Sequence, residues 1–391
     1  MIAFLLSVST LCYAQTDYWG TVRALREAGF ENIRMAENDS LLVLTLENDA
    51  YKLQASGLAA AIRLLDERGA LGDKPVKMIA TYYGVPQVTL TYDPALEEWN
   101  TTYKLDKSWK MVRKRVKHNS SFGKVDITVY PQISLMNLII TQVYQSLGQL
   151  NPAVEVSLWP GSKFSYQVKI PVWNDGYEAS ESKVHPGMIT LSQRFRAPWE
   201  IFGKATVGIF SNNRQGAALE LFRPFSFNER FSLEGTFAML GLCYWDGFVL
   251  HFDPRWKPFW SFGGNYYWPW LQTQFSLRVQ KFLLEDYGVK FEMIRHFRYC
   301  SIGFYAEKGL NSYAHANGGF RFQVALPPYR YRRYKYVPRI TTSGQMGLTN
   351  NANNEQRWYK ECRTEASDNI MEHNGFNPFY IDSEIKKLNN K

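Results

Sequence analysis

The chain has 391 residues, of which 16% are aromatic (12 Trp, 24 Tyr and 25 Phe) and only 21% are charged. This much apolar surface excludes an intrinsically disordered chain, and the lack of any run of about 18 apolar residues excludes a helical membrane protein. The net charge of +9 is concentrated in two runs, which argues against a nucleic-acid-binding protein. Lys104–Lys117 holds seven basic residues and one acidic one, and Tyr329–Arg339 holds five basic residues and no acidic one. Each run is either a solvated segment or a site that attracts lipid phosphates or an acidic polymer.

Residues 1–14 are typical of a signal peptide. Ile2–Leu11 supplies a short apolar core, and Cys12-Tyr13-Ala14 places small residues at the −3 and −1 positions before Gln15. Cys12 also allows a lipoprotein interpretation, which Leu11 disfavours because a small residue is required there. Removal of this segment leaves three cysteines without a CxxC pair, which predicts neither a disulfide framework nor a zinc site.

Residues 15–93 predict a small α+β domain with the element order αββαββ. Tyr18, Val22 and Leu25 have helical spacing, and Gly29 is a typical helix stop. The expected elements are a helix over Asp17–Gly29, strands over Asn32–Ala36 and Leu41–Glu47, a helix over Gly57–Arg68, and strands over Val76–Tyr83 and Gln87–Tyr92. Residues 94–124 are polar and basic, and they predict a linker or a first strand region.

Within residues 125–340, apolar and polar residues alternate in a series of runs. The segment Leu271–Lys281 is the clearest example, in which Leu271, Thr273, Phe275, Leu277 and Val279 alternate with Gln272, Gln274, Ser276, Arg278 and Gln280. Such strands recur without an intervening helix, and aromatic residues gather near their ends, as in an interfacial girdle. The girdle candidates are Trp256, Phe259, Trp260, Phe262, Tyr266, Tyr267, Trp268 and Trp270. We therefore expect a mainly β protein, a transmembrane β-barrel of the outer-membrane type with roughly 10–14 strands. A soluble sandwich is the alternative, and residues 341–391 are expected to be a polar tail.

In such a barrel the polar row of each strand faces the lumen. The lumen-facing candidates are Lys169, Glu220, Glu234, Gln274, Arg278, Lys290, Glu292 and Arg321. Their mixed charges, together with many aromatic rings, suit binding of a sugar polymer. A lumen that is polar only because water fills it is the alternative explanation.

Three runs in the first 90 residues resemble the small module of YjbH-type exopolysaccharide proteins. They are Leu25–Ile33, Glu47–Lys52 and Tyr83–Pro86, although Lys52 stands where that family usually has Arg. The resemblance implies an outer-membrane β-barrel encoded with capsule and exopolysaccharide export genes. The resemblance also implies that the protein lies in the outer membrane of a Gram-negative bacterium, with the small domain in the periplasm. Glu47, Asn48, Tyr51 and Lys52 are then candidates for contact with periplasmic export proteins, or for a structural role within the domain.

No catalytic motif is present, so we expect a non-enzymatic protein without a cofactor or a metal site. His251-Phe252-Asp253 could belong to a hydrolase site, but a histidine beside an Asp-Pro turn is the simpler explanation. Glu220, Glu234 and Glu292 could pair for glycoside cleavage, but lumen residues balanced by nearby cations are favoured. The expected function is export or assembly of an extracellular polysaccharide, with lipid and the polymer as partners. The alternatives are an outer-membrane enzyme acting on lipid or polysaccharide and a structural subunit of a larger secretion complex.

Overall fold

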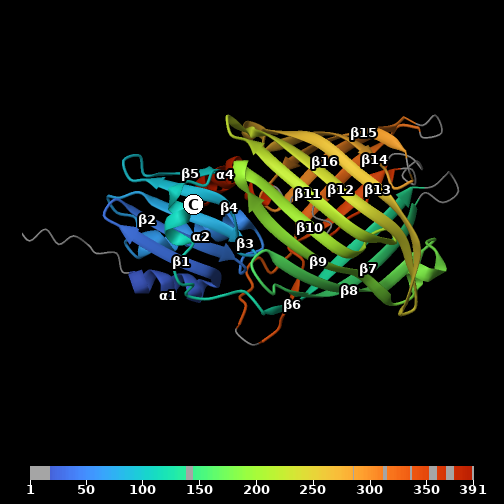
Figure 1. Cartoon of the computed structure of the whole chain (residues 1–391), viewed down its shortest axis with the longest axis horizontal. Coiled ribbons are helices and arrows are strands. Elements are labelled where there is room, and N and C mark those ends of the chain that lie inside the picture. Colours follow the sequence, from blue (N-terminus) through green and yellow to red (C-terminus); the bar gives the residue numbers. More distant parts are fainter. Residues whose placement is uncertain are drawn as a thin grey trace, which may run out of the picture.

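The computed structural model describes residues 18–137, 144–284, 286–310, 315–334, 337–351, 359–366 and 374–389. The signal peptide expected over residues 1–14 lies outside these ranges. The described chain is mainly β, as expected, with a five-stranded sheet near the N-terminus and a 14-stranded sheet beside it (Figure 1). None of the helices in the described ranges has the length and apolar character needed to span a bilayer.

The five-stranded sheet belongs to the small N-terminal domain, in which the expected αββαββ order is confirmed. The elements are α1 (Tyr18–Ala28), β1 (Phe30–Asn38), β2 (Leu41–Asn48), α2 (Gln54–Glu67), β3 (Val76–Tyr82), β4 (Val85–Asp93), β5 (Glu98–Thr102) and α3 (Lys107–Val112). The strands lie in sequence order, and β2 pairs in parallel with β3 because α2 connects them. Residues 94–124 therefore extend this domain by one edge strand and a short helix.

Both faces of the small sheet are covered. Leu25 of α1 and Leu58 and Leu65 of α2 pack in the main core on one face, and Val112 of α3 packs on Val43 on the other. Gly29 ends α1 at a positive φ of 99°, where a Cβ atom would lie 2.8 Å from that of Ala50. Burial on both faces explains why β2 reads as a continuous apolar run rather than an alternating one.

The large sheet is an antiparallel meander from β6 to β17. Its strands are β6 (Val125–Asn137), β7 (Tyr144–Val156), β8 (Ser162–Asp175), β9 (His185–Ala197), β10 (Ile201–Phe210), β11 (Arg214–Phe225), β12 (Asn228–Asp246), β13 (Val249–Trp268), β14 (Thr273–Lys281), β15 (Tyr287–His296), β16 (Cys300–Gly309) and β17 (Asn317–Ala325). Each pairs with its neighbours in the sequence. β14 begins later than the expected Leu271, because Pro269–Leu271 forms a 3₁₀ turn and Gln272 has a φ of 48°.

The two edges of the large sheet come from one stretch of chain. β18 (Arg339–Thr342) pairs in parallel with β6, and β19 (Gln345–Asn351) pairs antiparallel with β17. Only Ser343 and Gly344 separate them, and Ser343 N donates to Val129 O of β6 at 2.8 Å. The first and last strands in the order of the sheet are thus consecutive in the chain, and the sheet curves strongly between them (Figure 1).

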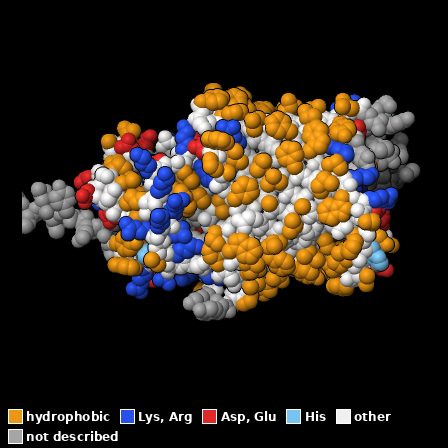
Figure 2. All heavy atoms as spheres, in the orientation of Figure 1, with side chains coloured by type: hydrophobic (Ala, Val, Ile, Leu, Met, Phe, Trp, Pro, Cys, Tyr) orange, Lys and Arg blue, Asp and Glu red, His pale blue; other side chains and the backbone are white. Residues whose placement is uncertain are grey.

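Apolar side chains predominate among the side chains on the side of the large sheet that faces the viewer in Figure 2. On β14, Leu277 is 55% exposed, whereas Ser276 and Gln280 are buried. Two of the aromatic residues expected in an interfacial girdle lie elsewhere, since Phe259 and Tyr267 are buried. The girdle prediction was wrong for these two residues because their side chains point to the inner face of β13. Phe262 and Trp268, at the alternate positions of the strand, point to the outer face.

The last described helix, α4 (Pro378–Asn389), joins the core of the small domain. Asn377 caps it by accepting from the backbone N atoms of Phe379 at 3.1 Å and Tyr380 at 3.3 Å. Ile381 and Ile385 are buried in the same core as α1 and α2. Residues 341–391, expected to be a polar tail, therefore also carry β19 and a helix that the sequence analysis missed.

Candidate functional site

A cavity of about 1170 Å³ lies on the inner side of the large sheet. Every strand from β6 to β19 contributes lining residues. The small domain forms one end wall, to which Asn48, Tyr51, Lys52, Tyr82, Tyr83, Gln87 and Tyr103 contribute. The volume exceeds that of usual small-molecule pockets, at about 300–1,000 Å³. The cavity is therefore large enough for a ligand bigger than a typical small molecule.

All eight lumen-facing candidates line this cavity. They are Lys169 on β8, Glu220 on β11, Glu234 on β12, Gln274 and Arg278 on β14, Lys290 and Glu292 on β15, and Arg321 on β17. Period-two alternation thus places them together although they are far apart in the sequence.

Glu292 lies at the centre of an ion cluster. It is 3% exposed and contacts Arg278, the Nη1 atom of Arg321 at 3.1 Å and the Nζ atom of Lys290 at 3.9 Å. Arg278 also pairs with Glu234. Glu234 and Glu292 both pair with Arg278 of β14, and Glu292 also pairs with Arg321, so the cluster links β12, β14, β15 and β17 across the inner face of the sheet.

Further charged residues line the cavity that were not predicted from the sequence, namely Glu155, Lys163, Arg194 and Lys204. Lys204 on β10 pairs with Glu220 at 2.6 Å, and Lys163 on β8 pairs with Glu155 at 2.8 Å. Arg194 on β9 also lines the cavity. The position of Lys204 could have been predicted from the sequence. Ala205 and Val207 point outward on β10, and because side chains alternate along a strand, Lys204 must point to the inner face.

The C-terminal segment 359–366 also lines the cavity. This position was not predicted from the sequence. Glu361 accepts from Lys290 Nζ at 2.6 Å and from Gln280 Nε2 at 2.7 Å. Glu365 contacts Lys204 Nζ at 3.1 Å and pairs with Arg194. No local pattern marks these contacts, since each joins residues more than 70 positions apart.

Backbone hydrogen bonds also attach this segment to the sheet. Ser211 N donates to Arg363 O at 3.1 Å, and Leu283 N donates to Lys360 O at 3.1 Å. At its start, the rings of Tyr359 and Phe282 meet edge to face with centroids 5.0 Å apart. The segment therefore lies against the chain just after the ends of β10 and β14, and it lines the cavity there.

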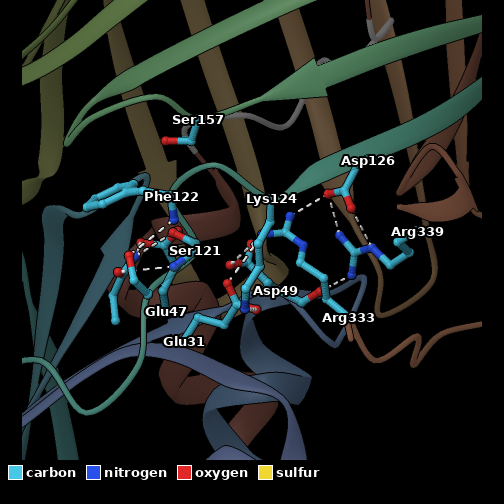
Figure 3. Close-up of polar contacts among 12 residues, drawn as sticks. Glu31, Glu47, Asp49, Ser121, Phe122, Lys124, Asp126, Ser157, Arg333 and Arg339 are labelled. Carbon is cyan, nitrogen blue, oxygen red and sulfur yellow. Dashed lines mark hydrogen bonds and ion pairs between the residues drawn. The ribbon is translucent and has the colours of Figure 1, made fainter. Parts of the chain in front are cut away.

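Charged residues join the small domain to the large sheet (Figure 3). Asp126 on β6 accepts from Arg339 Nε at 3.0 Å and from Nη2 at 2.8 Å in a two-point pair. Arg333 also pairs with Asp126, and its Nη1 atom lies 3.2 Å from Glu31 of β1. Part of the second basic run is thus used to anchor the domain, whereas the side chains of Lys107, Lys110 and Arg113 in the first run are exposed.

The four contact candidates of the small domain, Glu47, Asn48, Tyr51 and Lys52, make contacts within this domain or with the chain of the large sheet and the segment before it. Glu47 is 2% exposed, and the side chain of Asn48 accepts from Tyr51 N at 2.9 Å and donates to Tyr51 O at 3.0 Å. Tyr51 forms an isolated β-bridge with Arg330, and Lys52 Nζ donates to Thr341 Oγ1 at 2.7 Å. In this structure these residues hold the domain together and against the sheet.

Glu47 is the most enclosed ionisable group of the domain. Its Oε2 atom accepts from Gly84 N at 2.6 Å, from Asn32 Nδ2 at 2.9 Å and from Thr81 Oγ1 at 3.2 Å. Burial raises its pKa from 4.5 to about 7, and the nearby Asp49 carboxylate adds to this shift while the donors oppose it. Folding therefore binds a proton at Glu47 between these two pH values.

We expect Glu47→Gln to flatten the pH dependence of domain stability. Because the folded pKa is raised, the favourable contribution is complete below pH 4.5 and is lost as the pH rises through about 7. The wild-type domain should lose on the order of 2–3 kcal/mol over this range, and the variant should lose less. Hydrogen exchange of the β2 and β3 amides at pH 5, 6, 7 and 8 measures the effect. Glu67→Gln on the exposed end of α2 is the control, and equal slopes in both variants would refute the assignment.

The carboxylates considered for glycoside cleavage are each held in an ion pair: Glu220 pairs with Lys204 at 2.6 Å, and Glu234 and Glu292 pair with Arg278. Arg278 lies between Glu234 and Glu292 and contacts both, which is where the scissile bond would have to lie. His251 is exposed and stacks on Tyr244 at 4.9 Å, and it is not among the residues lining the cavity. Within the described ranges, no group of three His, Cys, Asp or Glu residues has the arrangement of a metal site.

No protein-family model matches the sequence, and neither a curated protein nor a solved structure matches the chain.

Proposed function

We propose that this protein is an outer-membrane β-barrel that supports export or assembly of an extracellular polysaccharide. The observation that carries the proposal is the sidedness of the large sheet, whose outer face is apolar and whose inner face is charged. Val207, Phe237 and Leu277 are each more than half exposed on strands that present Lys204, Glu234 and Arg278 to the cavity. An apolar outer face of this extent is stable when lipid covers it.

Closure of the sheet into a barrel is part of this proposal. The two edges of the sheet are β18 and β19, which only two residues separate, and Cα atoms of β19 approach those of β6 within 8 Å. Closure would leave no unpaired strand edge in contact with lipid, where unpaired backbone groups are costly.

The cavity supports a polymer as the cargo. It is large, it combines charged side chains with the rings of Tyr83, Tyr130 and Tyr305, and it extends from the small domain along the inner face of the sheet. Aromatic rings stack on sugar faces, and Gln, Arg and Glu side chains bind hydroxyl groups. The choice of a polysaccharide as the cargo rests on the resemblance to YjbH-type proteins. The small domain and segment 359–366 occupy the path, so we place the protein as a gated conduit or an accessory of the export machinery.

We expect the protein to fractionate with outer membranes and to run as a compact, heat-modifiable band on unheated gels. A closed hydrogen-bonded sheet resists detergent unfolding until it is heated, so the band should shift only after boiling. Cells that lack the protein should secrete less polymer, and the wild-type chain should restore secretion. Recovery of the protein as a detergent-free periplasmic monomer would contradict the membrane assignment.

Two alternatives predict different results in the same strains. An enzyme would shorten or modify isolated polymer in vitro, and one Ser, His or Glu substitution would abolish that activity. A structural subunit would co-purify with partners in a fixed ratio, and its deletion would leave polymer secretion unchanged. Lost secretion with intact polymer chemistry distinguishes the proposed function from both.

A further inference from the structure

We infer that segment 359–366 is a displaceable internal plug that occupies binding subsites for an acidic polysaccharide. This inference rests on the proposed function and deepens it by naming the chemical class of the cargo. Three observations on the cavity carry it. They are the groups with which the segment binds, the charges that it covers, and the length of chain that tethers it.

The segment binds with the groups that an acidic sugar chain carries. Two carboxylates, those of Glu361 and Glu365, lie four residues apart on the segment and pair with Lys290 at 2.6 Å and Lys204 at 3.1 Å. Thr364 Oγ1 donates to Glu220, as a sugar hydroxyl can. Asn212 Nδ2 donates to Glu361 O at 2.6 Å, a contact that another hydroxyl or carbonyl oxygen can replace. The cavity therefore already binds a chain segment that presents two carboxylates and a hydroxyl group.

The carboxylates of the segment neutralise cations that belong to the sheet. Lys290 is 2% exposed, and its Nζ atom is closer to Glu361, at 2.6 Å, than to Glu292, at 3.9 Å. Glu365 pairs with both Arg194 and Lys204. Departure of the segment without a replacement would leave these cations less well compensated, which is costly in a partly buried site. An incoming polyanion can supply the missing charge, so exchange is favoured over simple opening.

The attachments of the segment permit exchange. Apart from Tyr359, Cys362 and Ala366, the side chains of the segment are polar, and hydrogen bonds to water and to a ligand can replace their contacts. The anchor is instead α4, whose Ile381 and Ile385 are buried in the core of the small domain. The 22 residues between β19, which ends at Asn351, and the 3₁₀ turn that begins at Asn374 could span about 75 Å if they were extended. The segment can therefore leave the cavity while both of its flanking elements stay in place.

The native thiol of Cys362 reports the position of the plug. Cys243 and Cys300 are first replaced by Ser, which leaves Cys362 as the single cysteine after the signal peptide. The full-length protein in detergent is treated with a bulky, membrane-impermeant maleimide, and the rate of modification is measured. The added probes are polygalacturonate, neutral dextran of the same length, and polyglutamate. Glu361→Gln/Glu365→Gln is compared with Glu178→Gln/Glu181→Gln, which removes two other carboxylates that line the cavity.

Polygalacturonate is expected to raise the modification rate about tenfold, and dextran is expected to leave it unchanged. The Glu361/Glu365 variant should show a similar increase without polymer, and the Glu178/Glu181 variant should not. An unchanged rate with polygalacturonate would overturn the inference, as would an equal response to dextran or a response to polyglutamate alone. Such a failure leaves the proposed function standing, because membrane fractionation and polymer secretion do not depend on the movement of this segment.

Discussion

Glu292→Gln is expected to destabilise the large sheet by about 3–5 kcal/mol, the usual cost of removing one partner from a buried ion pair. Glu292 is buried among Arg278, Lys290 and Arg321. Its replacement leaves three cations with one fewer carboxylate between them. The measurement is the temperature or denaturant concentration at which the compact gel band converts to the unfolded one.

A second substitution should partly rescue this variant. Arg321→Gln removes one of the cations that Glu292 compensates, so the double variant should cost less than the sum of the two single ones. Glu178→Gln, at the exposed 3₁₀ turn between β8 and β9, is the control for loss of a carboxylate alone. Additive effects of Glu292→Gln and Arg321→Gln would show that the two side chains do not interact.

The alternation of side chains predicts a large part of this fold, because it can be read from each strand without knowledge of the contacts of that strand. Once Leu277 is assigned to the outer face, Gln274 and Arg278 must face inward, and all eight lumen candidates line the cavity for this reason. Phe259 and Tyr267 were predicted on the outer face because they are aromatic, although the alternation of side chains along β13 points them inward. Consistent use of phase along β13 would have placed both correctly.

Contacts between distant segments are the part that the sequence did not predict. Glu361 and Glu365 lie in a polar stretch without periodicity, and their partners are on β15, β9 and β10. The small domain is likewise anchored by two members of a basic run, Arg333, which pairs with Glu31, and Arg339, which donates to the Asp49 carbonyl oxygen. A charge run has the same pattern in sequence whether it is solvated or paired. By contrast, α4 had a readable signal in Asn377-Pro378, a cap followed by a proline at the first helical position.

Leu277→Arg is expected to prevent assembly of the protein in the membrane. Leu277 is on the outer face of β14, where it is 55% exposed and opposite Phe291 of β15. An Arg in contact with lipid costs roughly 2–4 kcal/mol near the bilayer midplane, which is a large share of the stability of a typical protein. The outer-membrane fraction and the heat-modifiable band should both decrease.

Gln274→Arg on the same strand is the matched control. Gln274 is half-buried, lines the cavity and donates to Ser276 Oγ at 3.1 Å, so an Arg there meets water and polar groups rather than lipid. Normal assembly of this variant beside loss of the Leu277 variant would support the assigned facing. The reverse result would mean that the facing is inverted, because a shift of one residue exchanges the two faces of a strand. Normal assembly of both variants would mean that water, not lipid, covers the outer face, and the membrane assignment would then be wrong.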